Sequence, residues 1–189
     1  KREYWTDAGW AQKERENWRE PRNWNDNRFQ GERKPVMGVS WYEAVAYSQW
    51  AGKWLPAEPQ WEKAAGWDPA TKTKRRYPWG NEYAADKGNF GQKHEQTTEV
   101  GQYPEDSSVY GLQDVIGNVV EWCSTRWRNE TGTDYRYPYD GEDGRENLEG
   151  GDEIYRVWKG AGWYWGIGNT REALRCGFRY WLGPRVRSY

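Results

Sequence analysis

The chain has few of the residues from which catalytic and metal centres are usually built. Its 189 residues include one histidine, His94, two cysteines, Cys123 and Cys176, and one methionine. His94 has no second histidine with which to form a metal site, so a solvated loop residue is the simpler interpretation. The two cysteines form no CxxC and no zinc-type spacing, which allows at most one disulfide and excludes a disulfide framework.

Long apolar runs and an excess of one charge are also missing. No stretch reaches the roughly 18 apolar residues of a transmembrane helix, and no signal peptide opens the chain. We therefore expect no membrane span, and either the cytoplasm or the cell surface as the compartment. The 28 basic and 29 acidic residues leave a net charge of −1. This balance gives no field that would attract nucleic acid or an anionic membrane.

Large aromatic side chains are abundant. The chain has 16 Trp and 14 Tyr against only 3 Phe. Disordered chains are poor in aromatics, so we expect a folded domain, and the length suits one domain over residues 1–189. Trp and Tyr bury large areas while keeping one polar group. They suit a core assembled from irregular segments, and equally a binding surface.

Local signals predict two helices, a strand and long loops. Ser40 and Glu43 form a capping box for a helix that ends near Lys53, and Pro59 lies in the first turn of a second helix that ends at Gly66. Residues 114–122 are the most strand-like run. Residues 67–104 are rich in turns, residues 128–152 read as a long surface loop, and residues 1–35 as an irregular arm.

Several motifs resemble, in the same order, those of the formylglycine-generating enzyme (sulfatase-modifying factor) family. They lie in residues 35–44, 55–65, 77–81, 110–122 and 156–160, and include Gly117-Asn118-Val119-Val120-Glu121-Trp122. The resemblance implies an irregular α+β fold related to C-type lectins, with two helices, short antiparallel strands and long loops. Family members usually carry further segments at both ends, so we expect a chain trimmed at both ends.

The family's chemistry is not matched in full. The resemblance implies that its oxidases bind copper through two cysteines after the Arg156-Val157 motif, but residues 163–171 contain none. Copper(I) requires such soft ligands. Cys123 and Cys176 read as buried core residues. Another branch of the family forms sulfur–carbon bonds with a separate His-rich iron domain, which a single histidine excludes within this chain. We therefore expect that the protein is not an enzyme.

The resemblance also implies a structural calcium ion. Its ligands would be the side chains of Asp114 and Glu121 and the carbonyl oxygens of Gly117 and Val119. These are hard oxygen ligands of the kind that calcium prefers. The alternative is a solvated acid at Asp114 and a buried, hydrogen-bonded carboxyl group at Glu121.

Residues 156–189 resemble the variable segment of proteins diversified by diversity-generating retroelements, and we interpret them as a ligand-binding segment. The side chains between its Arg, Gly and Pro residues would bind the ligand. They are Tyr164, Trp165, Ile167, Phe178, Tyr180, Trp181, Leu182, Arg185, Val186, Ser188 and Tyr189. Adenine-directed change of asparagine codons cannot yield Trp, and packing in the core is the alternative for the whole set.

The expected function is therefore non-catalytic binding of an unidentified protein or other macromolecule, without nucleic acid. The alternatives are a copper oxidase of the formylglycine-generating type and a regulatory domain of a larger bacterial protein.

Overall fold

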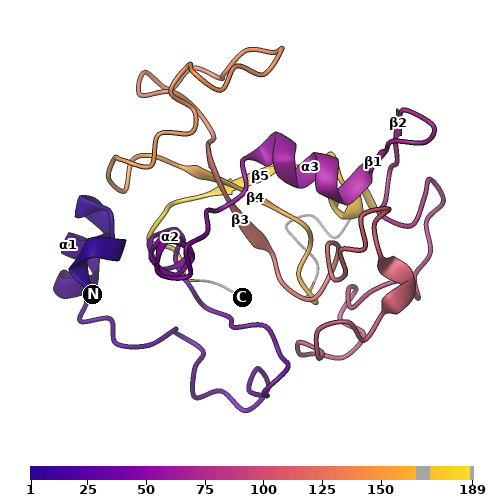
Figure 1. Ribbon diagram of the computed structural model, residues 1–189. Helices are drawn as coiled ribbons and strands as arrows, with labels where there is room; N and C mark the ends of the chain where they lie inside the picture. Colours follow the sequence, from indigo (N-terminus) through magenta and orange to yellow (C-terminus); the bar gives the residue numbers. More distant parts are fainter. Residues whose placement is uncertain (165–170, 188–189) are drawn as a thin grey trace.

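A computed structural model describes residues 1–164 and 171–187 of the chain (Figure 1). In chain order the elements are the 3-10 turn η1 (Arg2–Tyr4), α1 (Asp7–Arg15), α2 (Trp41–Trp50), α3 (Glu58–Gly66), β1 (Trp67–Asp68), β2 (Thr73–Lys74), η2 (Pro104–Asp106), β3 (Glu121–Arg126), β4 (Arg156–Lys159), η3 (Arg171–Leu174) and β5 (Tyr180–Leu182). The expected α+β fold with short antiparallel strands and long loops is confirmed.

The two expected helices are present as α2 and α3. The capping box of α2 is complete, because the Glu43 amide donates to Ser40 Oγ at 3.2 Å and the Ser40 amide donates to Glu43 Oε2 at 2.8 Å. The arm before α2 holds a helix that the sequence analysis did not predict, α1, where Thr6 Oγ1 accepts a hydrogen bond from the Gly9 amide at 3.1 Å. None of the helices in residues 1–164 and 171–187 is long and apolar enough to cross a membrane.

The main sheet is antiparallel with the order β3-β4-β5. Its register places Trp122 opposite Trp158, and Trp158 opposite Tyr180. The expected strand over residues 114–122 is wrong for most of its length, because β3 begins only at Glu121. Before it the backbone bends sharply, with positive φ angles of 56° at Asp114 and 63° at Asn118. Such angles do not occur in an extended strand.

Helices cover both faces of this sheet. On one face Trp41 of α2 donates to the Cys123 carbonyl at 2.9 Å and lies under the Arg156 guanidinium, 3.8 Å from the ring centroid. On the other face the Glu58 amide at the start of α3 donates to Thr125 Oγ1 at 2.7 Å. Figure 1 shows the strands at the centre, with α2 viewed end-on beside them and α3 above. The core therefore lies in two layers, one on each face.

The expected surface loop at residues 128–152 projects from this body at the top of Figure 1 and has a small core of its own. Arg145 is buried although it belongs to the loop. Its guanidinium lies 5.0, 5.7 and 4.7 Å from the ring centroids of Tyr135, Tyr137 and Tyr139. Asp143 accepts hydrogen bonds from the same guanidinium at 2.6 and 2.9 Å. A guanidinium between aromatic rings is stabilised by cation–π attraction.

Candidate functional site

The edge strand β5 brings together three of the residues that the sequence analysis assigned to ligand binding. The Tyr180 ring stacks on those of Trp181 and Phe178, with centroids 5.9 and 6.5 Å apart. Trp181 also meets Tyr155 edge-on at 4.5 Å and lies 6.5 Å from Trp127. We call Trp127, Tyr155, Phe178, Tyr180 and Trp181 the β5 aromatic cluster. Its side chains are partly exposed, and Tyr155 is 44% exposed.

Two members of this cluster, Trp127 and Tyr155, were missed by sequence reasoning. Both lie immediately outside a strand, Trp127 after β3 and Tyr155 before β4. The Trp127 amide donates to the Tyr155 carbonyl at 2.9 Å, which places the two residues side by side. Their shared position depends on strand pairing over nearly thirty residues, for which the sequence has no local signal.

A buried charge network lies beside the cluster, on the face of the sheet that α3 covers. The Lys159 ammonium, fully buried, lies 2.7 Å from Glu62 Oε1 and 3.6 Å from Glu58 Oε1. Arg179 forms an ion pair with Glu58 at 2.8 Å, and its guanidinium lies 4.3 Å from the centroid of the Trp127 ring. The network therefore fixes a cation against one face of the β5 aromatic cluster.

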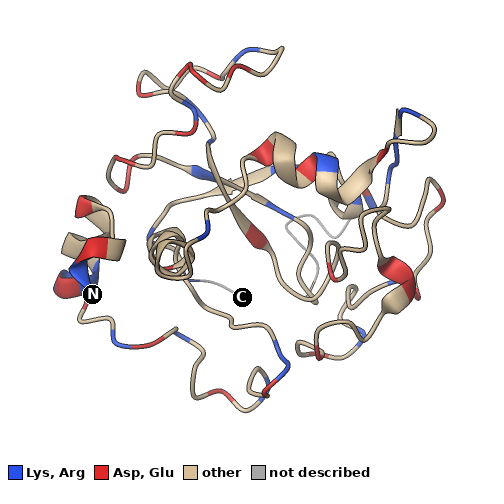
Figure 2. Cartoon of the chain, in the orientation of Figure 1, with Lys and Arg blue, Asp and Glu red and all other residues tan. Residues whose placement is uncertain are grey.

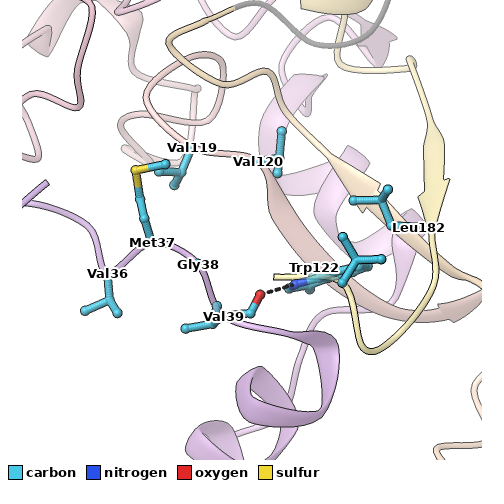
Figure 3. Close-up of a pocket in the computed structure, with 9 residues that line it drawn as sticks. Val36, Met37, Gly38, Val39, Val119, Val120, Trp122 and Leu182 are labelled. Atoms are coloured by element: carbon cyan, nitrogen blue, oxygen red, sulfur yellow. Dashed lines mark hydrogen bonds between the residues drawn. The ribbon is translucent and has the colours of Figure 1, made fainter. Parts of the chain in front are cut away.

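Other predicted binding residues lie elsewhere. Leu182 and Val186 line a cavity of about 30 Å³ together with Val36, Met37, Gly38, Val39, Val119, Val120 and Trp122 (Figure 3). This volume is about that of one water molecule, so it has no room for a ligand. Arg185 is well exposed and lies 3.5 Å from Asp152. The predicted set is thus divided between an aromatic cluster, an apolar cavity and the surface.

Tyr164 lies apart from β5. Its ring meets Trp163 edge-on at 5.5 Å, and Trp163 in turn packs against Phe29 at 6.0 Å. Burial raises the pKa of the Tyr164 hydroxyl. The remaining predicted binding residues, Trp165, Ile167, Ser188 and Tyr189, lie outside the described part of the chain.

The expected calcium ligands lie on the bend before β3 and at its first residue, Glu121, and both carboxylates already have partners. Asp114 Oδ2 accepts from the Gly101 amide at 2.6 Å, and its Oδ1 from Asn118 Nδ2 at 3.3 Å. Glu121 Oε2 accepts from the Trp61 indole. Burial, with the charge of Asp114, raises the pKa of the Glu121 carboxyl group to about 7 against the lowering effect of that hydrogen bond.

The two expected carbonyl ligands are held by tight backbone packing. Gly117 has φ of 102°, and a Cβ there would lie 2.8 Å from the Asn89 carbonyl oxygen. The Val119 carbonyl oxygen lies 3.7 Å from the place that a Cβ on Gly160 would take. A side chain at either glycine would be strained by the positive φ angle and by the close approach of neighbouring atoms. The bend therefore depends on these glycines.

A third acid, Asp106, joins Asp114 at this bend, and sequence reasoning missed it. Its Oδ2 accepts from the Asp114 amide at 3.0 Å, and its carboxyl group is 1% exposed. Burial, with the charge of Asp114, raises the pKa of Asp106 to about 7. Among the described residues, no three side chains of His, Cys, Asp or Glu are grouped so that they could hold a metal ion.

Both cysteines are free and fully buried in the core, as expected for structural residues. Burial raises the pKa of Cys176 to about 12 and that of Cys123 well above its ordinary value. Thiols of this kind are protonated at neutral pH and make poor nucleophiles or metal ligands.

Comparison with known proteins identifies relatives along the whole chain. The family model for the sulfatase-modifying factor enzyme 1-like domain matches residues 2–188. Hercynine oxygenase from Mycobacterium tuberculosis is 35% identical over 97% of this chain and 44% of its own length. Hercynine oxygenase from Mycolicibacterium thermoresistibile is 37% identical over 97% of this chain and 42% of its own. The chain thus spans less than half the length of these relatives.

The fold is also that of a solved variable protein. Treponema denticola variable protein 1 has a TM-score of 0.60 and 21% identity, over 89% of this chain and 74% of its own. The resemblance to variable proteins is therefore confirmed in fold. A sequence identity of 21% gives no information about function.

The expectation that the protein is not an enzyme is wrong. The relatives that match nearly all of the chain at 35–37% identity are named as oxygenases. Because the cysteine pair is missing, this chain cannot form a copper–thiolate centre by itself. Its absence does not exclude an enzyme that uses a different reactive group. From its motifs, its fold and the match over residues 2–188, the chain belongs to the sulfatase-modifying factor, or formylglycine-generating enzyme, family.

Proposed function

We propose that this chain is the substrate-binding part of an oxygenase of the hercynine oxygenase type, and that the β5 aromatic cluster binds the cationic group of the substrate. The observation that carries the proposal is the similarity to two hercynine oxygenases over 97% of the chain. The geometry supports it because the partly exposed aromatic side chains of this edge strand gather at one place.

The chemistry of hercynine suits this cluster. Hercynine is a betaine of histidine, so it carries a quaternary ammonium group that cannot donate a hydrogen bond. Aromatic ring faces are the usual partners of such a group, because the negative face of the ring attracts the cation. Arg179 already lies over Trp127, so the protein uses one ring of the cluster for a cation of its own. Tyr155 and Trp181 offer further ring surface beside it.

We propose that the metal for oxygen chemistry is held by another part of the complete protein. The sequence has one histidine, and the hercynine oxygenases are more than twice as long as the segment matched here. A separate His-rich iron domain, as in the branch of the family that forms sulfur–carbon bonds, would supply oxygen activation. The residues of this chain would bind the substrate, orient it and exclude water.

Calorimetric titration of this chain with hercynine tests the binding step. We expect saturable binding, weaker binding of histidine without its methyl groups, and an affinity about 3- to 30-fold lower in Trp181→Ala, the range of a cation–π contact. Trp54→Ala is the matched control, since Trp54 is 82% exposed and lies outside the cluster. Hercynine binding that is absent, or lowered equally by both substitutions, refutes the proposal.

The reaction is tested on the complete gene product. We expect oxygen uptake that depends on both hercynine and iron(II), and that falls in Trp181→Ala through a higher KM. Oxygen uptake that does not respond to hercynine would show that the substrate is a different one.

We also propose that the start of β3 and the bend before it bind a structural calcium ion through the side chains of Asp114 and Glu121 and the carbonyl oxygens of Gly117 and Val119. The support is a pair of neighbouring carboxyl groups for which no cation is found within the described residues. Thermal melting tests it: calcium should raise the melting temperature over that in chelator, and Glu121→Gln should abolish the difference. An identical melting temperature with calcium and with chelator would rule the site out.

A further inference from the structure

A polar cleft lies on the side of the molecule that carries the β1–β2 hairpin. Its lining consists of Lys74, Arg75, Arg76, Asn81, Arg175 and Gly177, and its volume is about 440 Å³. Figure 2 shows the basic residues along this hairpin and the segment that follows it. Volumes of this size accommodate small ligands, and the charged and amide side chains of the lining favour a hydrophilic one.

Two segments far apart in the sequence are fastened together to form the cleft. The Cys176 amide donates to the Arg76 carbonyl at 2.9 Å, so the segments that carry Arg175 and Arg76 form adjoining walls of the cleft. The Arg76 amide donates to Asn81 Oδ1, also at 2.9 Å. Because Asn81 uses its oxygen here, its Nδ2 group remains as a hydrogen-bond donor.

The charges of the cleft are only half compensated. Lys74 pairs with Glu62, and Arg75 pairs with Asp68 at 2.6 Å. Arg76 and Arg175 have no carboxylate within ion-pair distance in the part of the chain that the structure describes. The cleft therefore presents two uncompensated positive charges on its two walls.

Gly177 keeps the cleft open at its floor. A Cβ at this position would lie 3.2 Å from Lys74 Nζ, which is closer than ordinary contact distance. The glycine thus lets the ammonium of Lys74 lie close to the backbone at residue 177. Three kinds of donor, guanidinium, ammonium and amide, consequently line one small space.

We propose that this cleft binds a phosphate group. Two uncompensated guanidinium charges match a dianion, and a tetrahedral phosphate offers acceptor oxygens in several directions to donors that come from separate segments. A carboxylate carries one charge, and its two oxygens lie in one plane, so it can accept from fewer of these donors. The proposal does not rest on the proposed oxygenase function, and the residues that line the cleft are not members of the β5 aromatic cluster.

Calorimetric titration with inorganic phosphate at constant ionic strength tests the proposal on the whole chain. We expect saturable binding that weakens about tenfold in Arg76→Gln and in Arg175→Gln, the size of one lost charged hydrogen bond. Arg136→Gln is the matched control, because Arg136 is exposed and lies in the loop at residues 128–152. Both cleft side chains are exposed, so their substitution leaves the core intact, and unchanged melting temperatures verify this.

The ligand series separates the sources of the phosphate. Tighter binding of phosphoserine than of inorganic phosphate supports a phosphorylated ligand, and equal binding supports the free anion. The proposal is overturned if phosphate does not bind, if acetate binds as tightly as phosphate, or if Arg136→Gln weakens binding as much as the two cleft substitutions do.

Discussion

The buried lysine of β4 provides the sharpest test of how this fold is held together. Lys159 is fully buried, and its ammonium lies between Glu58 and Glu62, whose side chains are 4% and 23% exposed. Replacing it by methionine in Lys159→Met keeps much of the volume and removes the charge. Glu58 then retains Arg179 and Glu62 retains Lys74, so each acid loses one of two partners.

The expected cost follows from this geometry. Breaking a buried ion pair destabilises a protein by about 3–5 kcal/mol, because one charge is left buried without its partner. Since the second partners remain, we place Lys159→Met at the lower end, about 3 kcal/mol. For a domain of this size the melting temperature should fall by roughly 6–12 °C. Lys53→Met, at an exposed position, is the control and should change the melting temperature little.

The stability of the protein at acid pH gives a second measure of the contribution of Lys159. Burial raises the pKa of Glu62, but Lys159 and Lys74 together lower it more, so its folded-state pKa lies below the ordinary value. The stabilisation is therefore present above the unfolded-state pKa of about 4.3 and is lost as the pH falls through the folded-state value. We expect the difference in urea midpoint between the native chain and Lys159→Met to shrink on acidification.

Two results would refute this reasoning. One is a loss of less than about 1 kcal/mol in Lys159→Met, which would mean that the pair contributes no more than a surface ion pair does. The other is an equal loss at neutral and acid pH. The double variant with Glu62→Gln should lose less than the sum of the single losses, because both substitutions remove the same Lys159–Glu62 ion pair.

Further predictions concern the loop core and the thiols. Arg145→Met should destabilise the chain by about 2 kcal/mol and speed chymotrypsin cleavage within residues 128–152, because the tyrosines lose the guanidinium between them; cleavage at the native rate would contradict this. Neither cysteine should react with a thiol reagent in the folded protein at neutral pH, and both should react in urea, since burial raises both pKa values; rapid modification of the native protein would contradict their burial.

Much of the fold could be predicted because its signals are local. The capping box of Ser40 and Glu43 lies within four residues, and the structure reproduces it atom for atom. The bend at residues 114–118 could not be predicted in this way. Its positive φ angles are held by distant partners, such as the Asn89 carbonyl, which accepts from the Asn118 amide at 2.8 Å. A run of apolar residues beside Gly117 therefore resembled a strand.

The candidate site was predicted only in part for the same reason. Phe178, Tyr180 and Trp181 were found because they crowd one short segment. Trp127 and Tyr155 join them only through the register of β3, β4 and β5. Within β5 itself, Leu182 lines an apolar cavity while the preceding Trp181 meets Tyr155. Strand pairing, and not residue type, decides which of these side chains can meet a ligand.

The failed expectation about catalysis came from treating recognition and reaction as one site. Cysteine and histidine are needed where a soft or transition metal is bound. Their scarcity in this chain therefore bears on metal binding and not on substrate binding. A quaternary ammonium group needs ring faces, and the β5 aromatic cluster offers them. Its affinity for hercynine should therefore be the same with and without added iron(II). An affinity that required the metal would place the recognition of substrate, as well as the reaction, outside the described rings.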